Sequence, residues 1–118
     1  MSELKLVTRE NLQKFGVNKK LYFAYKRANK RALVVAGHSC YAMFTLDSNW
    51  YSIDHISYPN TDDLMFFLSD LSDFADKRNR SLKVNVCYQD VELQKTLADF
   101  DFTSIVSVEN EDIYTFYN

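Results

Sequence analysis

Hydrophobic residues recur at a helical period in the middle of the chain. Between residues 64 and 75 they fall at i, i+3, i+4, i+7, i+10 and i+11, and they are Leu64, Phe67, Leu68, Leu71, Phe74 and Ala75. Asn60 or Thr61 can cap this segment by accepting a bond from a free backbone N–H, and Pro59 ends the strand expected before it. The pattern predicts one amphipathic helix that begins near Thr61.

Shorter stretches are rich in β-branched and aromatic residues and are bounded by turn residues, which is typical of strands. They cover residues 3–8, 31–36, 40–46, 50–58, 81–88, 103–108 and 113–118. Residues 9–31 look helical, although Leu21–Tyr25 would also suit a strand, and Asp90 is expected to cap a short helix. Strict alternation along residues 50–58 would place Asp54 and His55 on opposite faces of the sheet.

The order of these elements predicts an α+β fold. Strands on either side of the long helix need a crossover connection and should pair in parallel, whereas directly connected strands should pair antiparallel. We therefore expect a mixed, mostly antiparallel sheet of about six to seven strands with helices on both faces. A chain of 118 residues suits one domain, which we expect to span residues 1–118.

Composition excludes several classes of protein. Hydrophobic residues make up 47% of the chain and aromatic residues 15%, which is enough apolar material for a packed core. No apolar run approaches the roughly 20 residues of a membrane helix, and the N-terminus lacks the build of a signal peptide, so we expect a cytoplasmic protein. Cys40, Cys87, His38 and His55 lack the spacing of metal ligands, and we expect no metal site and two buried free thiols.

Charge is divided unevenly along the chain. Residues 1–31 hold 9 Lys or Arg against 2 acids, and since the whole chain has 14 and 16, residues 32–118 hold 5 against 14. The basic stretch Lys19–Arg31 carries Tyr22, Phe23 and Tyr25 between its cations, which would suit phosphate contact and base stacking. The net charge of −2 disfavours a nucleic-acid partner, and the two halves can equally attract one another.

Residues Ser81–Phe102, SLKVNVCYQDVELQKTLADFDF, read as a hydrophobic strand, a polar turn and a helix. Together with the predicted order of elements over nearly the whole chain, this stretch resembles the GNAT-type N-acetyltransferase superfamily, at its fifth strand and the following helix. Typical members have an Asn in the turn and a closing Gly-Phe, where this chain has Asp90 and Asp101-Phe102. The resemblance implies a GNAT-like fold.

The resemblance also implies that the helix beginning at Thr61 would receive the pyrophosphate of acetyl-CoA. The residues expected around such a cofactor are Ile56, Ser57, Tyr58, Thr61, Asp62, Asp63 and Asp90. A diphosphate site needs free backbone N–H groups and glycines, usually after a basic residue, but the sequence here is YPNTDD. Like charges a few Å apart repel by about 1 kcal/mol in water and by about 4 kcal/mol at an effective dielectric of 20. We therefore expect no cofactor, and acetyl-CoA only if the protein is an enzyme.

Candidate catalytic residues are few. His55 could act as a general base with Asp54 as its partner, and Tyr117 could supply a phenol. The resemblance implies a Tyr on the short helix as general acid, but Leu97 stands at the corresponding position. If the chain is an enzyme, the expected reaction is N-acetyl transfer.

The sequence supports three hypotheses on function. The first is a non-catalytic GNAT-like module that binds or regulates a protein partner, with a homodimer left open. The second is an acetyl-CoA-dependent N-acetyltransferase with an atypical cofactor loop. The third is a small phage-type inhibitor whose acidic surface occupies a nucleic-acid-binding partner. Its acids would be Asp63, Asp70, Asp73, Glu109, Glu111 and Asp112.

Overall fold

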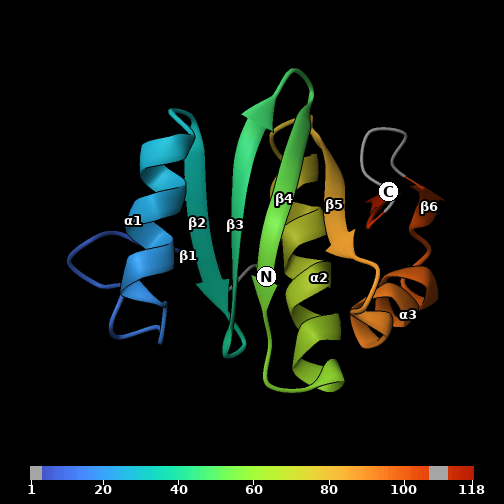
Figure 1. Ribbon diagram of the computed structural model, residues 1–118, viewed down its shortest axis with the longest axis horizontal. Helices are drawn as coiled ribbons and strands as arrows, with labels where there is room; N and C mark the ends of the chain where they lie inside the picture. Colours follow the sequence, from blue (N-terminus) through green and yellow to red (C-terminus); the bar gives the residue numbers. More distant parts are fainter. Residues whose placement is uncertain (1–3, 107–111) are drawn as a thin grey trace.

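The computed structural model describes residues 4–106 and 112–118 (Figure 1). The strands of this part are β1 (Lys5–Leu6), β2 (Ala32–Gly37), β3 (Cys40–Asp47), β4 (Trp50–Ser57), β5 (Ser81–Cys87), β6 (Thr103–Val106) and β7 (Ile113–Tyr117). The helices are α1 (Lys19–Ala28), α2 (Thr61–Asp76) and α3 (Val91–Asp99). No helix in the described ranges is long and apolar enough to cross a membrane.

The strands form one sheet of seven in the order β1-β2-β3-β4-β5-β7-β6. Only β4 and β5, the strands on either side of α2, pair in parallel, and the remaining neighbours in the described sheet pair antiparallel. The predicted α+β fold, its mostly antiparallel sheet and its one parallel join are therefore confirmed.

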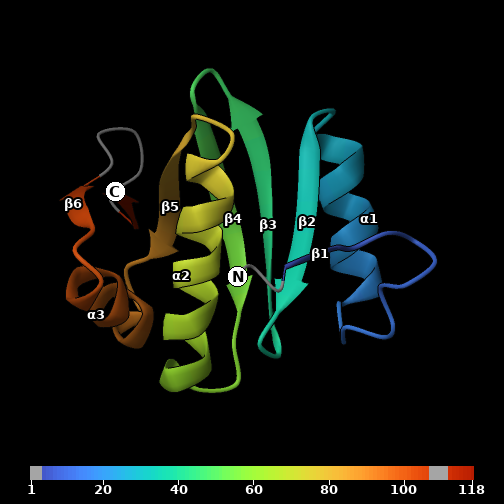
Figure 2. The same cartoon turned by 180° about the vertical axis from the view of Figure 1, so that it is seen from behind.

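Two hydrophobic cores cover the two faces of the sheet. The larger core includes Phe44, Ile53 and Val84 of the strands, Phe67, Leu68 and Leu71 of α2, and Leu97 of α3. The smaller core includes Val34, Ala36 and Met43 of the strands with Tyr22 and Tyr25 of α1. Successive residues of a strand point to opposite faces, and Val34 and Val35 accordingly lie in different cores. The helix α2 lies behind the sheet in Figure 1 and in front of it in Figure 2, so helices cover both faces, as predicted.

The first helix is shorter than the sequence predicted. Residues 9–16 form turns rather than helix, and Gly16 has a φ of 68°, in the left-handed region that a helix cannot use. The helix then begins after Asn18, whose side chain accepts a bond from the backbone N–H of Leu21. The prediction of a helix from Arg9 is wrong, and so is the alternative of a strand at Leu21–Tyr25.

The remaining boundaries follow the predictions closely. Asn60 caps α2 and Asp90 caps α3, both by accepting a bond from the backbone N–H three residues on. The final strands form the predicted antiparallel pair. The predicted acidic turn includes Glu109 and Glu111, which lie outside the described residues.

Candidate functional site

The parallel strands β4 and β5 separate part of the way along their length. They pair from Trp50 and Ser81 as far as Ile53 and Val84, and beyond that point β4 stays paired only with β3, and β5 only with β7. In Figure 1 the two strands lie close at the top of the view and diverge toward the bottom. A cavity of about 230 Å³ opens between the separated ends. We call it the β4–β5 cleft, and its lining includes Asp54, His55, Ile56, Ser57, Asn85, Val86, Cys87 and Asp90.

A β-bulge in β4 sets which side chains reach this cleft. Met43 of β3 pairs with His55, and the next residue, Phe44, pairs with Ile53, so Asp54 is an extra residue in β4. A bulge interrupts the strict alternation of side chains. Asp54 and His55 consequently both line the cleft, and the prediction that they point to opposite faces is wrong.

Tyr25 of α1 contacts both of these residues. Its hydroxyl donates to Asp54 Oδ2 at 2.7 Å, and its ring meets the His55 ring edge-on, with the ring centres 5.6 Å apart. Burial, and then the hydrogen bond to Asp54, raise the pKa of the Tyr25 phenol well above its usual value. Tyr25 therefore holds its proton and acts as a fixed donor toward Asp54.

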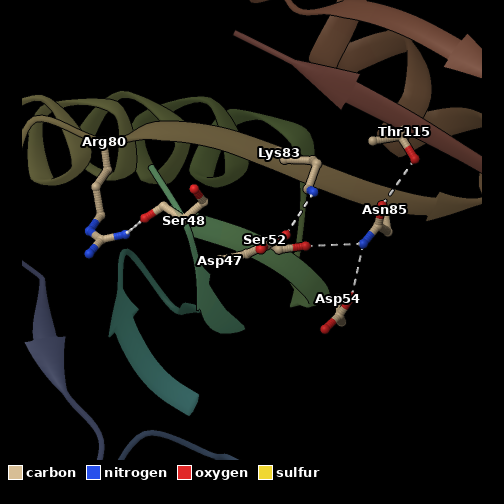
Figure 3. A network of polar contacts seen from close by, with 8 residues as sticks. All are labelled: Asp47, Ser48, Ser52, Asp54, Arg80, Lys83, Asn85 and Thr115. Atoms are coloured by element: carbon tan, nitrogen blue, oxygen red, sulfur yellow. Dashed lines mark hydrogen bonds and ion pairs between the residues drawn. The ribbon is translucent and has the colours of Figure 1, made fainter. Parts of the chain in front are cut away.

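A line of polar side chains continues from Asp54 across the sheet (Figure 3). Asn85 of β5 donates to Asp54 Oδ1 at 2.9 Å, and Thr115 of β7 donates to Asn85 Oδ1 at 3.0 Å. Asn85 also lies 3.4 Å from Ser52 Oγ. Because each partner is held by the next, Asp54 is fixed at the edge of the cleft with a donor on each carboxylate oxygen.

Tyr58 links the end of β4 to the start of α3. Its hydroxyl donates to Asp90 Oδ1 at 3.4 Å, and the same oxygen accepts the bond from Leu93 that caps α3. Burial, followed by the charges of Asp90 and Glu92, raises the pKa of Tyr58 to about 12. The phenol therefore remains a donor, and this contact joins the end of β4 to the cap of α3.

The start of α2 is capped by its own side chains. Asn60 Oδ1 accepts the backbone N–H of Asp63 at 2.8 Å, while Asn60 Nδ2 donates to Asp63 Oδ2 at 3.1 Å. This reciprocal pair uses one of the N–H groups that an anion would need, and it places a carboxylate beside the helix end. Asp62, in the same turn, is exposed.

A cavity of about 280 Å³ lies beside the start of α2, lined by residues of α2 and α3. Lys95 is its one cation, against the carboxylates of Asp62, Glu92 and Asp99. A diphosphate would meet a net negative lining here. The residues at the start of α2 thus do not fit the phosphates of acetyl-CoA, because the site lacks both glycine and an excess of positive charge.

The structure separates the two catalytic candidates. His55 is exposed and lines the β4–β5 cleft. Tyr117 pairs in register with Lys83, near the start of β5, and its ring contacts Trp50, so it belongs to the end of β5 away from the cleft. No general-acid role follows for Tyr117 from this position. His55 remains a candidate base by position.

The cofactor candidates fall into two groups. Ile56, Ser57 and Asp90 line the cleft, and Tyr58 lies beside it. Thr61 and Asp62 line the cavity at the start of α2, and Asp63 belongs to the cap. Binding by these residues stays a prediction.

One of the acidic residues predicted for the surface is buried instead. Asp70 is only 8% exposed, and it lies 2.8 Å from His38 Nε2 of the β2–β3 turn. It therefore hydrogen-bonds to His38 and does not belong to a solvent-exposed face of α2. Asp73 and Asp112 are exposed, Asp63 is half-buried, and partner binding through them stays a prediction.

Several residues at the cleft or bonded to its lining were not among the predicted ones. Asn85 and Cys87 line the cleft, and Tyr25 and Thr115 donate hydrogen bonds to the lining residues Asp54 and Asn85. Both cysteines are free, but Cys87 is exposed at the end of β5, which corrects the prediction of two buried thiols. Within the described ranges, no group of three or more His, Cys, Asp or Glu residues is placed to hold a metal ion.

No protein-family model matches this chain, and no curated protein matches it in sequence. Solved structures do match. The ribosomal-protein-S18-alanine N-acetyltransferase from Escherichia coli superimposes with a TM-score of 0.68 at 10% identity, over 99% of this chain and 92% of that one. Naa50 from Arabidopsis thaliana, solved with the bisubstrate analogue CoA-Ac-MVNAL, gives 0.63 at 16% identity, over 98% and 97%. The putative acetyltransferase yncA from Salmonella typhimurium, solved with acetyl-CoA, gives 0.59 at 13% identity, over 97% and 90%.

These matches establish the fold. The chain has the fold of the GNAT-type N-acetyltransferases, and the resemblance read from Ser81–Phe102 and from the order of elements is confirmed at that level. At identities of 10% to 16%, structural similarity establishes the fold alone. The chemistry must be argued from the residues of this chain.

Proposed function

We propose that this protein is a GNAT-fold binding module that does not use acetyl-CoA as a cofactor and acts by binding a protein partner. The observation that carries the proposal is the reciprocal Asn60–Asp63 cap at the start of α2, together with the exposed carboxylate of Asp62. In a cofactor-binding GNAT protein this helix end would face a diphosphate.

Electrostatics supports the proposal quantitatively. Each carboxylate a few Å from a phosphate opposes binding by about 1 kcal/mol in water and by about 4 kcal/mol at an effective dielectric of 20. Every ~1.4 kcal/mol lowers the affinity tenfold. Two aspartates without a compensating Lys or Arg in the same turn are therefore enough to weaken cofactor binding by a factor of about thirty or more.

The test is calorimetric titration of the folded protein with CoA and with acetyl-CoA. We expect no binding in the micromolar range for the natural sequence. The matched variant is Asp62→Asn/Asp63→Asn, which removes both charges and keeps the side-chain shapes. Binding that becomes measurable only in this variant would identify the carboxylates as the obstacle. Micromolar binding of CoA to the natural sequence would contradict the proposal.

A second candidate function is N-acetyl transfer with an unusual grip on the cofactor. It is favoured by the β4–β5 cleft, which brings His55 and the fixed carboxylate of Asp54 together at the diverging strands. In this alternative, backbone groups of Ile56–Tyr58 would hold the cofactor arm. Incubation of the protein with acetyl-CoA and a mixture of peptide amines, read out by mass spectrometry, tests it. A mass increase of one acetyl group that is lost in His55→Ala would favour catalysis over the binding module.

A further inference from the structure

Two cavities lie side by side on α1, away from the β4–β5 cleft. The larger, of about 570 Å³, is formed by residues 9–17 and the start of α1, and the smaller, of about 460 Å³, lies along α1. Lys19 and Phe23 line both. We call the combined surface the α1 groove, defined by Arg9, Lys19, Lys20, Phe23 and Arg27.

The rim of the α1 groove is positively charged and accessible. Its cations, Arg9, Lys19, Lys20 and Arg27, are all exposed. The close contacts between acidic and basic side chains in residues 4–106 and 112–118 are His38–Asp70 and Lys83–Asp47, and neither includes these cations. Within the described structure the four cations therefore make no ion pair with a carboxylate, although Glu10 also lines the larger cavity. The charge of these cations is available to a partner.

The floor of the α1 groove is apolar. Leu12 and Val17 line the larger cavity, where they are 7% and 5% exposed, and both also belong to the smaller hydrophobic core. Phe23 is half-buried between the two cavities and packs edge-on against Tyr22. An apolar floor within a charged rim suits a ligand that carries one bulky apolar side chain among opposite charges.

We propose that the α1 groove is the docking site for an acidic protein segment, with an apolar side chain seated against Phe23 and carboxylates paired with Lys19 and Arg27. The proposal specifies the partner class of the binding module proposed above, and it rests on that function. It does not depend on the start of α2, since the groove is built from α1 and the turns before it.

Single-stranded nucleic acid fits these observations less well. Tyr22 and Tyr25, the aromatic residues that the sequence offered for base stacking, are 5% and 6% exposed and belong to the core. A stacking surface needs accessible rings, and Phe23 alone remains at the groove.

The experiment is selection of a random peptide library displayed on phage against the intact protein, followed by anisotropy titration of the enriched peptides. The binding-site variants are Lys19→Glu/Arg27→Glu and Phe23→Ala. The control, Lys77→Glu/Lys95→Glu, reverses the same amount of charge at exposed lysines outside the groove. Circular dichroism melts establish that each variant is folded, and a labelled oligothymidylate is titrated in parallel.

We expect enriched peptides with Asp and Glu around a Leu, Phe or Trp, and binding that weakens with salt. The Lys19→Glu/Arg27→Glu and Phe23→Ala variants should each bind at least about tenfold more weakly, and the control no more than about twofold. Failure to enrich acidic peptides, equal loss in the control, or tighter binding of the oligothymidylate would overturn the proposal. The CoA titration tests the start of α2 separately. A negative result in the peptide experiment would therefore overturn the α1 groove without deciding whether the protein binds CoA.

Discussion

The β4–β5 cleft and the start of α2 lie next to each other along the chain but differ in what they could hold. The cleft has the diverging parallel strands of the fold, with a cavity between them and polar side chains at its edge. The start of α2 has the right backbone position for an anion, but Asn60 and Asp63 bond to each other there. Both regions border a cavity, but at the start of α2 the Asp63 N–H is already bonded and the lining carries more carboxylates than cations.

This difference shows that the architecture of a fold and the chemistry of its ligand site are set by separate residues. The divergence of β4 and β5 begins at the bulge at Asp54, and the apolar face of α2 packs in the larger core with both strands. The affinity for a diphosphate depends on a few side chains in one helical turn. Those side chains can change without cost to the core, so the proposed loss of cofactor binding is compatible with an intact fold.

The largest effect on stability is expected in the hydrophobic core of α2, which supports both the β4–β5 cleft and the start of α2. Phe67 of α2 is fully buried in the larger core, whereas its neighbour Phe66 is 61% exposed. Phe67→Ala should lower the free energy of unfolding by about 3–5 kcal/mol because it leaves a cavity. Phe66→Ala, the matched control, should change it by less than about 0.5 kcal/mol. Urea denaturation measures both, and equal losses would mean that the two faces of α2 are assigned wrongly.

The polar network at the cleft should contribute less than the core. Asp54 accepts bonds from Tyr25 and Asn85, so Asp54→Ala leaves the buried Tyr25 hydroxyl without its charged acceptor. We expect a loss of about 1–3 kcal/mol in the free energy of unfolding. Asp47 makes an exposed ion pair with Lys83, and Asp47→Ala should cost about 0–1 kcal/mol. If both variants unfold at the same urea concentration, the network is not a structural part of the cleft.

The dependence of stability on alkaline pH tests the same network separately. The pKa of Tyr25 is raised in the folded protein by burial and by Asp54, so the folded state keeps the phenol proton at a pH where the unfolded chain loses it. The contribution of Tyr25 to stability is complete below about pH 10 and is lost as pH rises from there toward the folded pKa. In this range the free energy of unfolding should fall by at most about 1.4 kcal/mol per pH unit through this group. Melts of the natural sequence and of Tyr25→Phe should diverge only above pH 10, and parallel curves would contradict this assignment.

The smallest effect is expected at the α2 cap. Asn60→Ala removes the acceptor for the Asp63 N–H and should cost about 1 kcal/mol. Asn60→Ser keeps a capping oxygen and should cost only a few tenths of that. Thermal melts at neutral pH compare the two variants. If Asn60→Ser lost as much stability as Asn60→Ala, α2 would require the Asn60 amide itself and not merely a capping oxygen.

Much of the fold could be predicted from the sequence because its signals are local. The helical period of Leu64, Phe67, Leu68 and Leu71 and the caps at Asn60 and Asp90 gave the elements around the cleft. The order of the elements then gave the parallel pair. The first helix was predicted too long, since the left-handed Gly16 is a break that an apolar pattern does not reveal.

The cleft itself could be predicted only in part. The bulge at Asp54 arises from pairing with β3, and no Gly or Pro marks it in the sequence, so the faces of Asp54 and His55 were assigned wrongly. The burial of Asp70 depends on His38, a residue 32 positions earlier. Such contacts between distant segments are set by tertiary packing. The charges at the start of α2, by contrast, could be read from the sequence directly.

The central claim is that the start of α2 does not hold a diphosphate, and a crystal soaked with CoA tests it most directly. We predict that no density for CoA phosphates will lie against Thr61–Leu64 in the natural protein. Density for the pyrophosphate at that helix end, with the Asn60–Asp63 bonds broken or displaced, would contradict the account.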